Sequence, residues 1–188
     1  MSHMNTNSPE QAKLNHLLKY YKERQFANAE KLALSITREY PDHQFAWKVL
    51  GAIFSLTGRF TEAVEVNKKS IALSPSDAEA YNNLGNTFNE IGKTLDAKES
   101  YEKAIEFKPE FAEPYYNLGN VLKILGQTRE AEESFKKTIS LKPDHVKSYN
   151  NLGVILQESD RLDEAVAMFK KAIGLNPKFA EAYSNLAN

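Results

Sequence analysis

The sequence predicts an all-α protein, a solenoid of antiparallel helix hairpins with a period of 34 residues. Two series of residues predict it. Five of the seven prolines are spaced 34 residues apart, at Pro41, Pro75, Pro109, Pro143 and Pro177. A leucine-glycine pair recurs with the same spacing, at Leu50-Gly51, Leu84-Gly85, Leu118-Gly119 and Leu152-Gly153. A fixed period of roughly 20 to 50 residues is typical of proteins built from stacked structural repeats.

Each period contains the signals of two helices. In the period that starts at Ala78, one helical face carries Tyr81, Leu84, Gly85 and Phe88. Gly92 ends this helix, because glycine adopts the left-handed conformation cheaply, and Pro109 ends the next one. The second helices are expected to start near residues whose side chains can cap free amides, namely Thr61, Thr94, Thr128 and Asp163. A single hairpin cannot bury its apolar face, so neighbouring hairpins must stack.

The prolines also divide the chain. We predict full repeats at 44–77, 78–111, 112–145 and 146–179, a degenerate repeat at 10–43, and the first helix of a further repeat at 180–188. Residues 1–9 are polar, and we expect them to be a disordered cloning remnant. A polar helix that would cover the last apolar face does not follow residues 180–188, which indicates an excised fragment and predicts self-association through this end.

Composition and charge exclude several classes of protein. The 24 basic and 25 acidic residues give a net charge of −1, whereas nucleic-acid modules carry a basic excess. The absence of cysteine excludes disulfides and cysteine-ligated zinc. No apolar run approaches the ~18 residues that a membrane-spanning helix needs. We therefore predict no nucleic-acid partner, no membrane insertion and a cytoplasmic location.

The repeated residues resemble those of the tetratricopeptide repeat (TPR) family. The family pattern is an aromatic residue, Leu-Gly, an aromatic or leucine, a glycine, an alanine, an aromatic, an alanine and a proline. The repeat 78–111 matches it at every position, while 44–77 has Asn67 in place of the second-helix aromatic residue. The repeat 10–43 departs most, with Lys13 and His16 in the opening signature and Arg24 in place of glycine. The resemblance implies a right-handed superhelix with a concave groove.

The helical period shows which residues of each first helix lie opposite its packing face. The resemblance implies that this opposite face lines the groove. It carries a column of asparagines at Asn83, Asn86, Asn117, Asn120, Asn151 and Asn185. Carboxamides donate and accept hydrogen bonds, which suits the backbone of an extended peptide. The column resembles the groove of the O-linked N-acetylglucosamine transferase repeats; the alternative is an ordinary solvated surface.

The repeat 44–77 carries apolar residues on the same face instead. Phe45, Val49 and Leu56, together with Ala52, form a continuous stripe. Leaving such a stripe in water costs about 25 cal/mol per Å². Two interpretations are open. The stripe is a pocket for an anchor residue of a partner, or the repeat 10–43 or the segment 1–9 folds over it.

No catalytic constellation is present in the sequence. The four histidines form no ligand pair at helical spacing, and no phosphate-binding loop or serine elbow occurs. We therefore predict no catalytic residue, no cofactor and no metal site in this chain. The predicted function is a non-catalytic protein-interaction scaffold that binds an extended peptide or a partner helix. The alternatives are a self-assembly module, or the substrate-recruiting arm of a larger enzyme resembling O-linked N-acetylglucosamine transferase, with a catalytic domain beyond Asn188.

Overall fold

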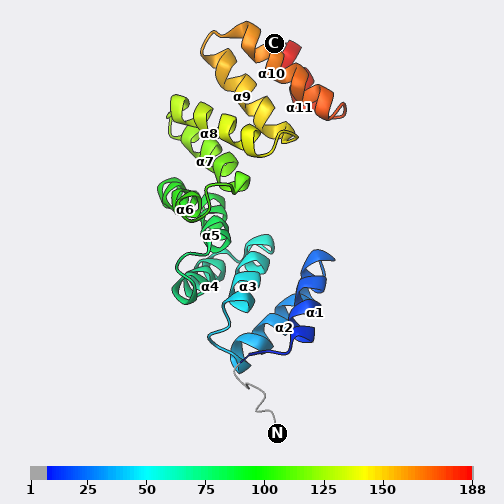
Figure 1. Cartoon of the computed structure of the whole chain (residues 1–188), viewed down its shortest axis with the longest axis vertical. Helices are drawn as coiled ribbons and strands as arrows, with labels where there is room; N and C mark the ends of the chain where they lie inside the picture. The colour runs from blue at the N-terminus through cyan, green and yellow to red at the C-terminus, as the bar shows by residue number, and fades with distance from the viewer. Residues whose placement is uncertain (1–7, 188) are drawn as a thin grey trace. The chain divides into compact units, whose positions relative to one another are not determined.

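The computed structural model describes residues 8–187, and all regular secondary structure in this range is α-helical (Figure 1). The helices are α1 (Gln11–Lys22), α2 (Phe26–Glu39), α3 (Gln44–Leu56), α4 (Phe60–Leu73), α5 (Ala78–Glu90), α6 (Thr94–Phe107), α7 (Ala112–Ile124), α8 (Thr128–Leu141), α9 (Val146–Glu158), α10 (Leu162–Leu175) and α11 (Ala180–Ala187). This confirms the all-α prediction. Within the segment 1–9, residues 1–7 lie outside the described range, and Pro9 is buried.

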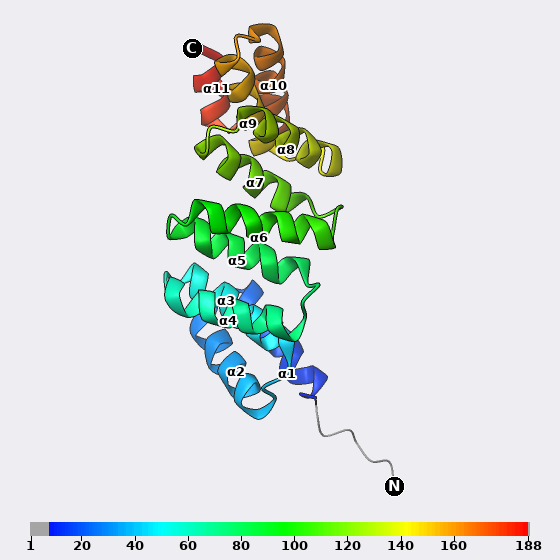
Figure 2. The ribbon, with the colours of Figure 1, turned by 90° about the vertical axis from the view of Figure 1, so that its left-hand side faces the viewer.

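The chain forms two compact units, residues 1–107 (unit 1) and 108–188 (unit 2). Within unit 1, three antiparallel hairpins pack in chain order: α1 with α2, α3 with α4, and α5 with α6. Within unit 2, α7 pairs with α8 and α9 pairs with α10, while α11 packs on α9 and α10. Figure 2 shows α5 and α6 running alongside each other as one hairpin. Some first helices also contact the first helix of the next hairpin: α1 contacts α3 and α3 contacts α5 in unit 1, and α9 contacts α11 in unit 2.

A glycine in the first helix lets the two helices of a hairpin approach closely. A Cβ atom at Gly119 would lie 2.7 Å from the buried ring of Phe135, and one at Gly153 would lie 2.5 Å from that of Phe169. Real Cβ atoms do not approach neighbours so closely, so the ring occupies the space that a side chain would need. The repeated Leu-Gly pair is therefore a packing signal, in which the glycine receives an aromatic ring from the second helix.

The hairpin turns all use the left-handed backbone conformation. Gly58, Gly92 and Gly126 have φ angles of 76°, 73° and 73°. Arg24 and Asp160 stand at the same place in their hairpins and adopt φ angles of 57° and 60°. The turn geometry is thus kept even where the sequence has lost its glycine, at the steric cost that a Cβ atom brings to this conformation.

The second helices start at the predicted places: α6 at Thr94, α8 at Thr128, and α4 and α10 one residue before Thr61 and Asp163. The capping expected there is wrong for α4, α8 and α10, because no side chain caps these helices. At the start of α4, Arg59 instead donates to Glu62 in the same helix and to Glu30 in the preceding hairpin. Arg161 forms the same pair of contacts in unit 2, with Glu164 and Glu132. The tight left-handed turn places a long basic side chain where it can link two hairpins.

The degenerate first repeat has an exposed ion pair where the third repeat has stacked rings. In the third hairpin, the rings of Tyr81 and Phe107 stack with centroids 5.5 Å apart. At the equivalent positions of the first hairpin, Lys13 and Glu39 form an exposed ion pair with an Nζ–Oε2 distance of 3.0 Å. The departures from the repeat pattern in 10–43 thus convert a packing surface into a solvated one.

The hairpin of α3 and α4 lacks the aromatic ring of the pattern. Asn67 takes its place and is fully buried. Its Nδ2 donates to Thr87 Oγ1 over 3.3 Å, whereas its Oδ1 has no hydrogen-bond partner within residues 8–187. An unpaired buried carbonyl costs about 1–3 kcal/mol. Among the described hairpins with a full Leu-Gly signature, this is the one in which a polar side chain faces the glycine.

Replacing Asn67 with phenylalanine is expected to stabilise the protein. The Asn67→Phe variant removes the unpaired carbonyl and restores the ring that the other hairpins use, while Thr87 keeps its bond to the Asn83 carbonyl. We expect the free energy of unfolding to rise by about 1–2 kcal/mol in urea denaturation. Asn28→Phe, on the exposed side of α2, is the matched control and should change little. A destabilised Asn67→Phe variant would show that the site has adapted to the amide.

Candidate peptide-binding face

The candidate site is the side of the first helices opposite the face that packs in the hairpin, which we call the groove face; in α5, α7 and α9 it lies opposite the glycine-aromatic contact. In unit 1 it belongs to α1, α3 and α5, and in unit 2 to α7, α9 and α11. The predicted asparagines on it are all partly exposed, with none fully buried and none fully exposed: Asn83, Asn86, Asn117, Asn120, Asn151 and Asn185. Each of these side chains is therefore open on one side and in contact with the protein on the other.

In unit 2 the amides bind one another. Asn185 Nδ2 donates to Asn150 Oδ1 over 2.9 Å, and Asn151 Nδ2 donates to Asn120 Oδ1 over 2.8 Å. A longer bond of 3.4 Å joins Asn150 Nδ2 to Asn151 Oδ1. These three bonds form an amide chain from α11 through α9 to α7. A carboxamide has two N–H donors and two acceptor lone pairs, so each member that donates in this chain keeps a second N–H.

Sequence reasoning missed Asn150. It precedes the predicted position by one residue and is almost completely buried. Nevertheless it connects α11 to α9, and its hydrogen bonds orient Asn185 and Asn151, two partly exposed members of the amide chain. The signal that could have found it is the asparagine doublet, which occurs at 82–83 and again at 150–151.

In unit 1 the two predicted asparagines, Asn83 and Asn86, differ in the hydrogen bonds of their side chains. Asn86 Oδ1 accepts a hydrogen bond from the Tyr101 hydroxyl over 2.9 Å. Burial, helped by the negative charge of Glu90, raises the pKa of Tyr101, so the phenol keeps the proton that it donates. The side chain of Asn83, by contrast, has no hydrogen-bond partner within residues 8–187. Its amide is the better placed of the two to bind a ligand.

The apolar stripe on α3 has a buried part and an exposed part. Val49 is only 6% exposed and belongs to a core cluster with Leu17 and Leu50, while Phe45 is partly buried against this cluster. Because α1 packs against α3, the first hairpin covers this part of the stripe. Internal packing, the second of the two interpretations, therefore describes Val49. Leu56 lies beyond the covered part and is 59% exposed.

A partly buried ion cluster lies at the start of the groove face in unit 1. Lys48 Nζ lies 3.0 Å from Asp77 Oδ2 and 2.7 Å from Glu79 Oε2. Asp77 also caps α5 by accepting from the backbone N–H groups of Glu79 and Ala80. Burial of this carboxyl opposes ionisation, but the Lys48 ammonium and the Ala80 amide hold the pKa of Asp77 below its ordinary value. The positive charge of Lys48 is thus neutralised within the protein.

Between residues 8 and 187, no three His, Asp or Glu side chains are placed so that they could hold a metal ion. In the same range, none of the helices combines the length and the apolar character that crossing a membrane requires.

Comparison with known protein families decides what these hairpins are. A family model described as TPR repeat matches residues 51–92 and 85–126, and one described as Tetratricopeptide repeat matches residues 110–178. The chain belongs to the tetratricopeptide repeat family. The matched ranges include the groove-face asparagines of unit 1 and, in unit 2, Asn120, Asn150 and Asn151 of the amide chain, whereas Asn185 lies beyond them. A comparison with curated protein sequences found no significant match.

Solved TPR structures cover nearly the whole chain. MamA is 30% identical with a TM-score of 0.76, and the match covers 87% of this chain and 95% of MamA. YrrB, described as a TPR protein with an unusual peptide-binding site, is 17% identical with a TM-score of 0.75 over 96% and 93% of the two chains. TTC0263 of Thermus thermophilus is 24% identical with a TM-score of 0.73 over 95% and 97%. The last two likenesses concern the fold alone.

A charge introduced on the covered part of the stripe should disrupt the core. We expect Val49→Glu to lower the free energy of unfolding by about 3 kcal/mol or more, because it buries an unpaired carboxylate. Leu56→Glu, on the exposed part of the same helix face, should change it by about 0.5 kcal/mol at most. Urea denaturation of both variants measures the difference. Equal effects of the two substitutions would contradict the division of the stripe.

Proposed function

We propose that this chain is a non-catalytic protein-interaction scaffold that binds an extended peptide on the groove face of its hairpins. The observation that carries the proposal is the set of partly exposed carboxamides at one register of successive first helices. An extended peptide suits them better than a partner helix, because its backbone N–H and C=O groups lack partners, whereas those of a helix are bonded internally. Backbone contacts of this kind tolerate many ligand sequences.

The amide chain of unit 2 supports this proposal in a second way. Because Asn120 and Asn151 are linked by a hydrogen bond, their side chains are held in one orientation before any ligand binds. Preorganised groups lose less conformational entropy on binding, which raises affinity. Family membership points the same way: YrrB shows that a stack of TPR hairpins can carry a peptide-binding site.

The other predicted roles have less support. The likeness of the asparagine column to the O-linked N-acetylglucosamine transferase repeats, and with it the role of a substrate-recruiting arm, stays a prediction that no comparison above supports. The cytoplasmic location also stays a prediction.

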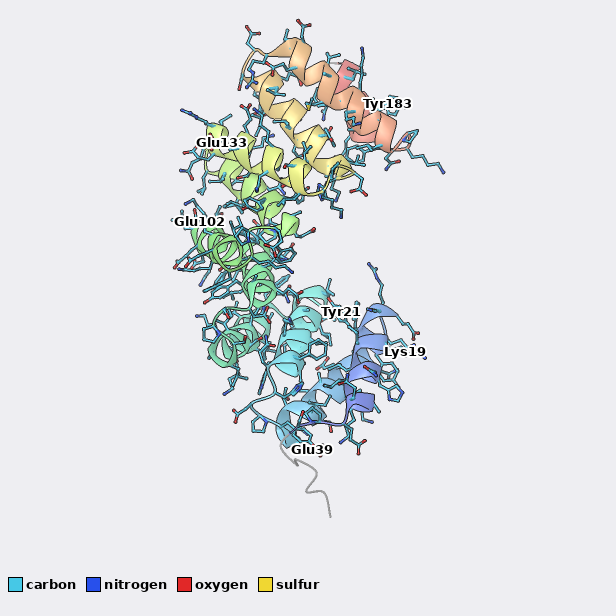
Figure 3. All side chains as sticks on the ribbon, viewed as in Figure 1. Lys19, Tyr21, Glu39, Glu102, Glu133 and Tyr183 are labelled. Carbon is cyan, nitrogen blue, oxygen red and sulfur yellow. The ribbon has the colours of Figure 1, made fainter. Side chains whose placement is uncertain are left out.

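Self-association is a second candidate function, favoured by one observation in unit 2. Tyr183, which is labelled in Figure 3, lies on α11 and is 48% exposed, whereas Tyr149, at the equivalent position of the preceding hairpin, is 8% exposed. Tyr149 packs into a cluster with Ala172 and Ala182. Tyr183 therefore presents the same aromatic surface to solvent that the preceding repeat buries, and a second copy of this chain is the proposed occupant.

The peptide-binding proposal predicts the behaviour of a triple variant. Asn83→Ala, Asn117→Ala and Asn151→Ala together remove backbone-binding amides from both units. Peptides selected from a random 12-residue library on the wild-type chain should bind this variant at least about tenfold more weakly in fluorescence anisotropy, since each lost hydrogen bond is worth about 0.5–1.5 kcal/mol.

Asn28→Ala and Asn89→Ala, on exposed positions outside the predicted column, provide the matched control and should leave binding unchanged. Circular dichroism must show the same helical content for all variants. Equal affinity of the triple variant and the wild type would refute a role for the amides.

Self-association predicts a dependence of mass on concentration. The wild-type chain should sediment as a heavier species as its concentration rises, because dimerisation would cover the exposed face of α11. Leu186→Glu places a charge on that helix and should keep the protein monomeric over the same range. A wild-type chain that stays monomeric at high concentration would exclude this second candidate.

A further inference from the structure

An open hollow of about 430 Å³ lies between α1 and α2, the blue hairpin of Figure 1. Both helices line it, with the side chains of His16, Tyr20, Asn28, Lys31, Leu32 and Ser35. Tyr20 and Leu32 are partly buried against the core and supply apolar surface, whereas the other four side chains are exposed and polar. Binding clefts typically combine apolar surface with a few polar groups in about 300–1,000 Å³.

The hollow lies on a helix face that the next hairpin buries. The residues equivalent to His16 and Tyr20 in the second hairpin are Leu50 and Phe54, which are 1% and 4% exposed. Leu50 and Phe54 pack in one core cluster with Ile36 of α2, so in that hairpin the face is covered by a neighbouring hairpin. On α1 the same face is open at His16. The hollow is therefore separate from the groove face, which is on the other side of α1.

The lining of the hollow carries a positive charge and no negative one. Lys31 is a full cation, and none of the other five lining residues is acidic. In the next three hairpins a glutamate stands in the place of Lys31, with a lysine four residues later: Glu65 and Lys69, Glu99 and Lys103, Glu133 and Lys137. Such pairs stabilise a helix surface. The first hairpin has Lys31 and Ser35 instead, and residues 27, 28 and 34 are also uncharged, so Lys31 has no acidic neighbour at helical spacing.

The acidic residues of α2 are engaged elsewhere. Glu30 accepts a hydrogen bond from Arg59 of the second hairpin, and Glu39 belongs to the exposed ion pair with α1. Lys31 itself forms no ion pair or hydrogen bond with any described residue. The same holds for Arg38, which is exposed two helical turns beyond Lys31 on the same face of α2. The edge of the hollow thus presents two cations that the protein does not neutralise.

We propose that this hollow docks an acidic segment of a protein partner, in which an apolar residue stands beside an aspartate or glutamate. The apolar side chain enters the hollow and packs on Tyr20 and Leu32, while the adjacent carboxylate pairs with Lys31. A second acidic residue further along the segment pairs with Arg38. The hollow is an interaction site in addition to the groove face, and it does not depend on the proposed function.

Charge and shape favour this occupant. Residues 1–7 contain no acidic residue, so they do not supply the carboxylate. A single lysine beside apolar surface suits a carboxylate with an apolar neighbour, whereas nucleic acids are bound by several cations that neutralise successive phosphates. The equivalent face of the second hairpin is covered by protein, which shows that this helix face accepts apolar side chains.

The test is a selection of random 12-residue peptides on the full chain after depletion on its Lys31→Glu variant. Glutamate stands at the same place in three other hairpins, so this variant should fold. Depletion removes peptides that bind the groove face, because both chains carry it. Among the peptides that remain, we expect aspartate or glutamate next to leucine, isoleucine or phenylalanine. Depletion on Lys171→Glu, an exposed lysine of α10, is the matched control and should leave no such class.

Binding of the selected peptides is then measured by fluorescence anisotropy. Lys31→Glu should weaken it about fivefold or more, and rising salt should weaken binding to the wild type. Ser35→Trp places a ring at the hollow and should weaken binding about tenfold, because it takes the space of the apolar side chain. Ser140→Trp, at an exposed position of α8, is its control and should change nothing. Circular dichroism checks that all variants keep the helical content of the wild type.

Each contrary result overturns the assignment of the hollow. No peptides left after depletion on Lys31→Glu would do so and would leave the groove-face proposal untouched. Acidic peptides without an apolar neighbour, or peptides that bind Ser35→Trp as well as the wild type, would show charge attraction without a docking site. A change of sedimentation in Lys31→Glu would identify a second copy of the chain as the occupant in place of a partner segment.

Discussion

The contact between a glycine of the first helix and an aromatic ring of the second is the interaction on which each regular hairpin depends. At Gly85, Gly119 and Gly153 the ring lies where a Cβ atom would be. Because this contact fixes which side of the first helix turns inward, it also fixes the side that turns outward. The groove face, with its asparagines, is therefore a consequence of core packing. The left-handed turns complete the hairpin and are kept even at Arg24 and Asp160.

Departures from this contact mark the places where hairpins differ in role. In the first hairpin, an exposed ion pair between Lys13 and Glu39 replaces the stacked rings of the third hairpin. In the second hairpin, buried Asn67 replaces the ring, and the junction with α5 is held by hydrogen bonds from Asn67 and Ser55 to Thr87.

The repeat period predicted the helices well. The first helices start at Gln44, Ala78 and Ala112, the residues from which the sequence pattern was counted. The period gives the position of each residue within its own hairpin. It therefore predicted which asparagines lie on the groove face, and the structure shows that these side chains are partly exposed. It could not find contacts between hairpins, because these join residues from different periods. The bond from Asn185 to Asn150, the clamp from Arg161 to Glu132 and the burial of Val49 under the first hairpin are of this kind.

The most direct test of the central contact is a double-mutant cycle on Gly119 and Phe135, measured as free energies of unfolding in urea. Gly119→Ala should cost about 1–3 kcal/mol in the wild type, because the added Cβ overlaps the ring. In a Phe135→Leu background, where the ring is absent, the same substitution should cost little, which gives a coupling energy of about 1 kcal/mol or more. Additive costs in the two backgrounds would contradict the account, since they would show that the glycine is not there to receive the ring.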